Sequence, residues 1–211
     1  VNFAPVCDVS TDPNSFIYDR TLGKDAAATA DYVAAVIRGS NGAQIGVGTV
    51  MKHFPGYGDN TDTHTGIAID ERPIETFRTS DFLPFQAGIE ASDGTAAVLV
   101  SHNIVTCMDP DRPASLSPAV YDILREELGF YGPTLTDDLA MNAITKFAKK
   151  QEQSPAVLAL AAGCDMVVTS EFQKEFSQVL TAIEEGILPP DRVDEAVSRV
   201  LGWKYDLGLL S

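Results

Sequence analysis

The segment from Lys52 to His64 concentrates reactive side chains: two histidines, two aspartates and a lysine stand within thirteen positions. It opens with Lys52-His53, after an apolar run typical of a buried strand, and it closes with Asp62-Thr63-His64. A histidine titrates near neutral pH, and a nearby carboxylate can fix its tautomer and raise its basicity. Asp62 and His64 therefore fit a general acid/base pair, although the same residues also fit a polar surface turn.

A metal site is the rival interpretation of this segment. Imidazole and carboxylate groups that could ligate Zn²⁺ or Mn²⁺ are present on His53, Asp59, Asp62 and His64. Their spacing matches no standard zinc pattern such as HExxH. We therefore expect neither a metal ion nor another cofactor.

Asp137 is the second candidate for chemistry, because it stands directly after an apolar strand in Thr136-Asp137-Asp138-Leu139. Its carboxylate would face the open end of a parallel sheet, where it could act as a nucleophile. Asp138 would point elsewhere and is better explained as a structural residue or a helix cap.

Polar residues follow every predicted strand, not only this one. A set of such residues at the carboxyl end of a parallel sheet is typical of a barrel active site. The alternative is that each residue only caps the next helix, which is the stronger explanation for Ser170 and Glu171. The polar residues that follow the first three predicted strands are Asp8 with Asp19-Arg20 beyond it, Lys52-His53, and Ser101-His102-Asn103.

The elements that must position these groups are short apolar strands alternating with helices. Strands are expected at 1–7, 47–54, 95–101, 132–137 and 165–170, and helices at about 25–39, 81–91, 117–129, 154–163, 171–185 and 191–205. Five consecutive βα units predict a parallel sheet, and continuous apolar strands predict that both of its faces are covered. The choice lies between a doubly wound sheet and a (β/α)8 barrel, which typically needs about 250 residues and eight strands.

Composition excludes several classes of protein. The chain of 211 residues carries a formal net charge of -15, which argues against binding nucleic acid or an anionic membrane surface. We see no apolar run of the roughly 18 residues that a membrane span needs. Three scattered cysteines argue against a disulfide framework, so we expect Cys7, Cys107 and Cys164 to be buried thiols.

Several motifs together resemble glycoside hydrolase family 3, in its β-N-acetylglucosaminidase (NagZ-like) branch. The resemblance spans almost the whole chain. It is carried by Asn2-Phe3-Ala4-Pro5-Val6-Cys7-Asp8, Asp19-Arg20-Thr21, Lys52-His53-Phe54-Pro55-Gly56, Asp62-Thr63-His64, Ser101-His102, Thr136-Asp137-Asp138-Leu139-Ala140-Met141 and the closing stretch from Arg199 to Leu210.

The resemblance implies a role for each candidate residue. Asp137 matches the family's nucleophile, and His64, supported by Asp62, matches its general acid/base. The residues that match sugar-binding positions are Arg20, Lys52, His53 and His102. The implied activity is that of a retaining exo-β-N-acetylglucosaminidase acting on small cell-wall or related amino-sugar glycosides. A phosphorylase of the same fold, or an inactive sugar-binding fragment, remains the alternative.

The resemblance also implies that the fold is of the parallel (β/α) TIM-barrel type, present here as an incomplete barrel of about five βα units. Residues 1–211 would form a partial (β/α)8 catalytic domain that lacks the N-terminal units. An open barrel exposes a sheet edge and apolar interior, so self-association is possible. A longer chain or a rearranged edge would equally cover the exposed sheet edge and apolar interior. The expected location of the protein is the bacterial cytoplasm or the cell surface.

Overall fold

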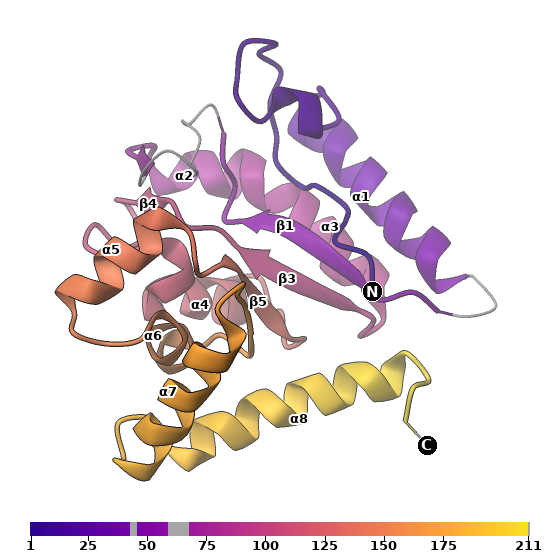
Figure 1. Ribbon diagram of the computed structural model, residues 1–211. Coiled ribbons are helices and arrows are strands. Elements are labelled where there is room, and N and C mark those ends of the chain that lie inside the picture. Colours follow the sequence, from indigo (N-terminus) through magenta and orange to yellow (C-terminus); the bar gives the residue numbers. More distant parts are fainter. Residues whose placement is uncertain (43–45, 59–67, 211) are drawn as a thin grey trace.

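The computed structural model describes residues 1–42, 46–58 and 68–210 (Figure 1). Its main sheet has four strands in the order β1-β3-β5-β6, and every neighbouring pair is parallel. Because spatial order follows sequence order, the chain winds in one direction, as the wall of a barrel does. A doubly wound sheet would reverse its strand order. The strands are β1 (Thr49–Phe54), β3 (Ala96–Val100), β5 (Thr134–Asp138) and β6 (Met166–Val168).

The N-terminal segment lies beside β1 but is not the continuous strand that its sequence predicts. It pairs in parallel through two isolated bridges, Asn2 with Thr49 and Val6 with Lys52. Pro5 lies between them, follows a cis peptide bond and has no N–H to donate to a ladder. The prediction of a strand over 1–7 is therefore correct in that the segment runs parallel to β1 in the sheet. It is wrong in that the segment does not form a continuous ladder.

The helices follow the sequence pattern closely. Asp25 begins α1 (Ala26–Asn41) by accepting the backbone N–H of Ala28 on its side chain. Ser154 begins α6 in the same way, and Gly163 ends it with φ near 120°. The remaining longer helices are α3 (Phe82–Ser92), α5 (Asn142–Lys150), α6 (Pro155–Ala162), α7 (Phe172–Glu184) and α8 (Pro190–Asp206).

Three features were not predicted from the sequence. A second, two-stranded sheet pairs β2 (Ile69–Asp70) with β4 (Ile104–Val105) in parallel. Helix α5 is the second feature. The third is that helical stretches contain π-helical segments: Phe77–Asp81 follows α2 (Ile74–Thr76), and Ile123–Glu127 follows α4 (Pro118–Asp122). Single helical turns are also present at Tyr18–Arg20 and Ala114–Leu116.

Both faces of the main sheet are covered, as predicted. One face packs Met51, Val98 and their neighbours against α1 and α3. The other face packs Val50, Leu99 and Leu135 against Trp203 of α8, which runs beneath the sheet in Figure 1. The Trp203 indole also donates a 2.8 Å hydrogen bond to the carbonyl of Thr95.

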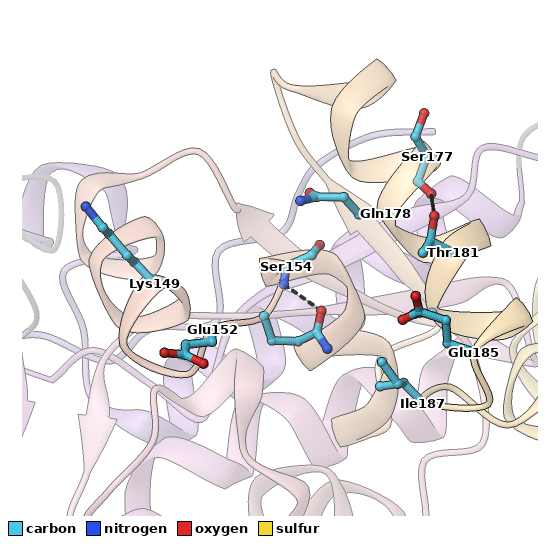
Figure 2. A pocket seen from close by; sticks show the side chains of 10 residues that line it. Lys149, Glu152, Ser154, Ser177, Gln178, Thr181, Glu185 and Ile187 are labelled. Carbon is cyan, nitrogen blue, oxygen red and sulfur yellow. Dashed lines mark hydrogen bonds between the residues drawn. The ribbon is translucent and has the colours of Figure 1, made fainter.

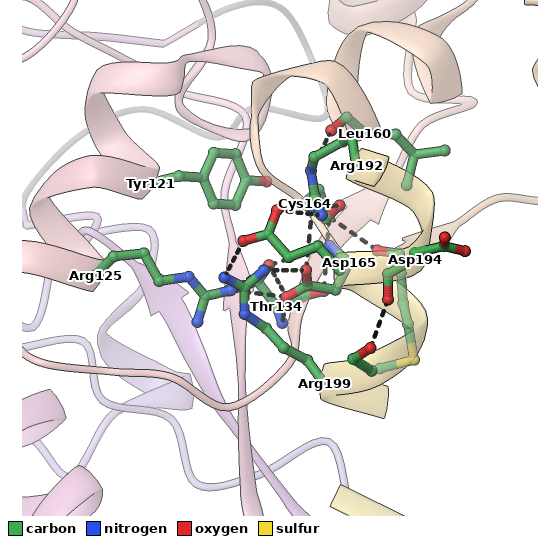
Figure 3. Close-up of polar contacts among 12 residues, drawn as sticks. Tyr121, Arg125, Thr134, Leu160, Cys164, Asp165, Arg192, Asp194 and Arg199 are labelled. Atoms are coloured by element: carbon green, nitrogen blue, oxygen red, sulfur yellow. Dashed lines mark hydrogen bonds and ion pairs between the residues drawn. The ribbon is translucent and has the colours of Figure 1, made fainter. Parts of the chain in front are cut away.

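A buried carboxylate ties α8 to the amino ends of the strands (Figure 3). The Asp165 side chain is fully buried and accepts the backbone N–H of Thr134 at 2.9 Å. It also forms ion pairs of 2.7–3.0 Å with Arg125, Arg192 and Arg199. Because this end of a parallel barrel serves stability, we assign the cluster to the scaffold.

The cysteine prediction is correct for two thiols and wrong for the third. Cys7 and Cys164 are buried, whereas Cys107 is exposed, and all three are free thiols. Cys107 follows the edge strand β4, which contributes only two residues to a small sheet and leaves the next positions at the surface.

Candidate active site

Predicted site residues from four sheet segments meet at the carboxyl edge of the main sheet. Asp8 follows the N-terminal segment, Lys52 and His53 lie in β1, His102 follows β3, and Asp137 lies near the end of β5. Parallel strands bring these positions to one edge, which is where barrel enzymes carry their chemistry.

Asp8, His53 and Arg20 form a continuous hydrogen-bonded chain. Asp8 is 1% exposed, and its Oδ2 accepts from the backbone N–H of His53 at 3.1 Å and from Nδ1 of the same residue at 2.8 Å. Nε2 of His53 lies 3.1 Å from Nη2 of Arg20. Since guanidinium only donates, Nε2 accepts and Nδ1 carries the proton. Asp8 thus fixes the ring, and the ring orients the exposed Arg20.

Lys52 stands beside this chain, half-buried. Burial and the positive charge of Arg20 lower its pKa, whereas the carboxylates of Asp137 and Asp8 oppose that change. These four charges therefore share one electrostatic site. The ammonium also lies 6.0 Å from the centre of the Phe3 ring. A lysine and an arginine at the edge of the sheet provide donors suited to hydroxyl groups.

His102 is fully buried, and both of its ring nitrogens are engaged. Nε2 donates to the backbone carbonyl of Asp138 at 3.1 Å, so Nδ1 accepts from the Ser115 hydroxyl at 2.7 Å. Burial lowers its pKa, which keeps the ring neutral. The structure therefore gives His102 a place behind the end of β5, where it holds the backbone, rather than a free nitrogen for sugar.

The two acids at the end of β5 have different surroundings. Oδ1 of Asp138 accepts the backbone N–H groups of Ala140 and Ser170, at 2.9 and 3.2 Å, which is the structural role expected of it. Asp137 is half-buried, and its Oδ1 accepts the N–H of Asp138 at 2.9 Å. Its second carboxylate oxygen has no hydrogen bond among the described residues, which suits a nucleophile.

Asp62 and His64, the predicted acid/base pair, lie outside the described residues, as does Asp59. In the part of the chain that the structure describes, no group of three or more His, Cys, Asp or Glu residues could hold a metal ion. Over the same residues, no helix is long and apolar enough to cross a membrane.

Sequence reasoning missed a buried ion-pair cluster that is centred on Arg72. Arg72 pairs with Asp70 and Asp81, two buried carboxylates, at 2.8 and 3.0 Å. The sequence signal for this cluster is Gly56-Tyr57-Gly58, because two glycines separated by a single residue often mark a place where another group approaches the backbone closely. The sequence predicts Asp8 at a strand end but does not predict its contact with His53, because the two residues are 45 positions apart.

A depression of about 550 Å³ lies elsewhere, between the α5–α6 connection and α7 (Figure 2). Lys149, Glu152, Gln178 and Glu185 are among the residues that line it. None of the strand-end residues lines it, and its polar groups belong to exposed helix surfaces. We do not assign it to the site.

Sheet order and strand-end chemistry together define a parallel α/β protein of the barrel-enzyme type. The family model "Glycosyl hydrolase family 3 N terminal domain" matches residues 1–202, and the chain belongs to this family. It is 36% identical over 204 residues to a beta-hexosaminidase of Stenotrophomonas maltophilia strain K279a, covering 96% of this chain and 53% of that protein.

Solved structures agree with this placement. A family 3 beta-N-acetylglucosaminidase from Paenibacillus is 33% identical with a TM-score of 0.88, over 99% of this chain and 40% of that one. The beta-N-acetylglucosaminidase of Thermotoga maritima is 27% identical with a TM-score of 0.82, over 99% and 44% of the two chains. The present chain therefore spans about half the length of the curated relatives it matches, and less of these two structures.

Proposed function

We propose that this chain carries the active site of a retaining exo-β-N-acetylglucosaminidase that acts on small cell-wall or related amino-sugar glycosides. The observation that carries the proposal is the strand-end site in which Arg20 is hydrogen-bonded to His53 and the charge of the neighbouring Lys52 interacts with the carboxylate of Asp137. Relatives named for hexosaminidase activity support the same substrate class.

In the first step, a carboxylate oxygen of Asp137 attacks the anomeric carbon of the sugar. The glycosidic bond breaks, and the leaving oxygen takes a proton from the imidazolium of His64. In the second step, neutral His64 removes a proton from water, the water oxygen bonds to the anomeric carbon, and the bond to Asp137 breaks. Two displacements retain the configuration, and Asp62 stabilises the charged ring of His64.

Arg20, Lys52 and His53 are proposed to bind the sugar. Arg20 is the outermost, because its side chain is held on one side by Nε2 of His53 and is otherwise exposed. Lys52 supplies a second positive donor close to Asp137. For His102, the two engaged ring nitrogens support a positioning role under Asp137 and Asp138 in place of direct sugar contact.

Residues 1–211 are proposed to be part of a (β/α)8 domain. In the described residues the sheet has four strands and an adjoining N-terminal segment, and it does not close on itself. A longer chain or a second copy would supply the rest of the barrel wall. The described sheet has β6 at one edge and the N-terminal segment at the other, where such a wall would attach.

The test is hydrolysis of a chromogenic β-N-acetylglucosaminide by the 211-residue chain, beside a form extended at its N-terminus. We expect the extended form to release the chromophore with retained configuration. Dependence of the rate on added phosphate would identify a phosphorylase instead. Weak sugar binding without turnover in both forms would leave only a binding role and overturn the proposal.

A further inference from the structure

Three N–H groups of the strand-end site converge on the side chain of Asp8. Its Oδ2 accepts the backbone N–H of His53 at 3.1 Å and the Nδ1–H of the same residue at 2.8 Å. Its Oδ1 accepts the backbone N–H of Tyr57 at 2.8 Å. Asp8 is 1% exposed and His53 is 3% exposed, so bulk water does not compete for these bonds. An ionised carboxylate accepts through both oxygens and donates nothing, which suits three N–H groups.

The peptide unit between Lys52 and His53 is held at both of its polar groups by residues 7 and 8. The carbonyl of Lys52 accepts the backbone N–H of Cys7 at 2.6 Å, and the N–H of His53 donates to Asp8. The backbone N–H of Lys52 donates to the carbonyl of Pro5 at 3.2 Å. Two residues that we propose to bind sugar therefore take their backbone position from the N-terminal segment. Of these three bonds, only the bond to Asp8 involves a side chain that a substitution can remove.

The ring of His53 is fixed at a nitrogen and along one side. Tyr57, whose backbone Asp8 holds, is 2% exposed, and its ring packs edge-on with its centre 5.1 Å from that of the imidazole. The hydrogen bond made by one ring nitrogen decides which nitrogen carries the proton. Because Nδ1 donates to Asp8, Nε2 is left as the acceptor of the ring. The carboxylate thus selects both the orientation and the tautomer of His53.

The orientation of Arg20 depends on that tautomer. Its Nη2 donates to Nε2 of His53 at 3.1 Å, which is the only hydrogen bond of this side chain among the described residues. The rest of Arg20 is exposed. A proton on Nε2 would set one donor against another and release the guanidinium to solvent. Asp8 therefore acts on Arg20 through the ring between them.

The charge of Asp8 also reaches Lys52. It raises the pKa of this lysine, against the lowering by burial and by the charge of Arg20. A scaffold carboxylate such as Asp165 instead directs its oxygens at arginines. In the described part of the chain, Asp8 forms no ion pair with a lysine or an arginine, because N–H groups of β1 and of the turn after it occupy its oxygens. It adds negative charge to the site and leaves the donors of Lys52 and Arg20 to a ligand.

We propose that Asp8 is a positioning residue for sugar binding: it holds the peptide unit between Lys52 and His53 and selects the His53 tautomer on which the orientation of Arg20 depends. The binding half of this inference rests on the proposed function, in which Lys52 and Arg20 contact the sugar. The half that concerns the tautomer rests on the hydrogen bonds alone.

The first experiment reads the ring of His53 by long-range ¹H–¹⁵N correlation spectra, which distinguish a protonated ring nitrogen from a bare one. The chain has three histidines, and His53→Gln identifies the signals of His53 by their loss. We expect the proton on Nδ1 alone in the unaltered chain at pH 8. In Asp8→Ala the proton should move wholly or in part to Nε2, because Nδ1 has lost its acceptor. In Arg20→Ala it should stay on Nδ1, because Asp8 is still present.

Asp109→Ala is the matched control for Asp8→Ala. Asp109 also accepts three donors, the backbone N–H groups of Asp111 and Arg112 and the hydroxyl of Ser117, at 3.0, 3.2 and 2.6 Å. None of these donors belongs to the strand-end site. The change therefore removes as many hydrogen bonds as Asp8→Ala and should leave the tautomer of His53 unchanged.

The tautomer spectra can overturn the inference in three ways. Retention of the proton on Nδ1 alone in folded Asp8→Ala would show that Asp8 does not select the tautomer. If Asp8→Ala fails to fold, the unaltered chain and Arg20→Ala still decide. A proton on Nε2 in the unaltered chain, or one that leaves Nδ1 in Arg20→Ala, would contradict the proposed dependence.

The second experiment measures KM and kcat for a chromogenic β-N-acetylglucosaminide, in whichever form turns it over, the 211-residue chain or the N-terminally extended one. In the unaltered background, Arg20→Ala should raise KM by about tenfold, the effect of one hydrogen bond from a charged donor, with a smaller effect on kcat. In the Asp8→Ala background, where Arg20 is already released, the same change should raise KM by no more than about twofold. The Asp109→Ala background should keep the full effect.

The outcomes separate this inference from the proposed function. Equal effects of Arg20→Ala with and without Asp8 would overturn the positioning role, because Asp8 would then contribute only to stability. An active enzyme in which Arg20→Ala leaves KM unchanged would remove Arg20 from sugar binding, and the binding half with it. Absence of turnover in both forms would overturn the proposed function, and the tautomer spectra would still decide whether Asp8 orients Arg20.

Discussion

At the scale of single residues, the end of β5 separates two adjacent aspartates by their partners. Asp138 is committed to backbone N–H groups of the turn that follows, whereas one oxygen of Asp137 is left for chemistry. Asp137→Ala should therefore abolish turnover of an aryl β-N-acetylglucosaminide, with the thermal midpoint close to that of the unaltered protein. A residual rate near that of the unaltered enzyme would remove Asp137 from the nucleophile role.

Asp81 makes a second residue-scale prediction, about pH. Burial raises its pKa from the ordinary 3.8 to about 7, so the native state keeps a proton that the unfolded state has lost between those values. Stability from this group is therefore present below about pH 4 and is lost as the pH rises to 7. The charges that face Asp81 are Arg72, Asp70 and Asp8.

Asp81→Asn should remove that loss, which amounts to at most about 4 kcal/mol. Urea unfolding at pH 4.5, 6 and 8 would measure it as a difference between the two proteins, which cancels the other titrating groups. The free energy of unfolding of the variant should fall less over this range than that of the unaltered protein. Parallel curves would contradict the prediction.

At the scale of elements, the Asp165 cluster decides whether α8 stays on the sheet. Two of its three arginines, Arg192 and Arg199, lie on α8, and the third, Arg125, lies in the π-helical segment after α4 (Figure 3). Asp165→Ala would leave three cations facing one another in a largely buried site. We expect a loss of about 3–5 kcal/mol in the free energy of unfolding, measured by urea denaturation.

Glu195→Ala is the matched control for that prediction. Glu195 contacts the same arginines, Arg192 and Arg199, but its side chain is half-exposed. Surface ion pairs contribute little, so the loss should stay under about 1 kcal/mol. If the two variants lost equal amounts of unfolding free energy, burial of the Asp165 carboxylate would not be the source of its contribution to stability.

Element type and order could be predicted from the sequence because apolar runs and capping residues act locally. Asp25, Ser154 and Gly163 set their helix ends as expected. Contacts between distant segments could not be predicted, because no local pattern encodes them. Asp8 meets His53 across 45 positions, and Arg72 reaches back to Gly56 across 16. His102 shows the limit most clearly: its position was predicted, but only packing shows that both nitrogens are engaged.

At the scale of the whole molecule, apolar side chains remain at the surface of the last two helices. On α7 they are Phe172, Phe176 and Leu180, and on α8 Val197, Leu201 and Tyr205, each set spaced four residues apart along one helix face. Their exposed fractions range from 46% to 66%. Large exposed apolar faces usually mark an interface. The last strand of the main sheet, β6, also offers an unpaired edge.

We therefore expect the 211-residue chain to self-associate at micromolar concentration, which sedimentation velocity would detect as a concentration-dependent coefficient. Phe176→Asp with Leu201→Asp should return it to a monomer, because each charge would lose hydration on association. Tyr131→Asp, at a 73% exposed site outside both helices, is the control and should leave association unchanged. If an N-terminally extended chain stays monomeric, we infer that its additional units cover the apolar faces of α7 and α8. A monomer at every concentration in both forms would contradict the prediction and show that these faces need no partner.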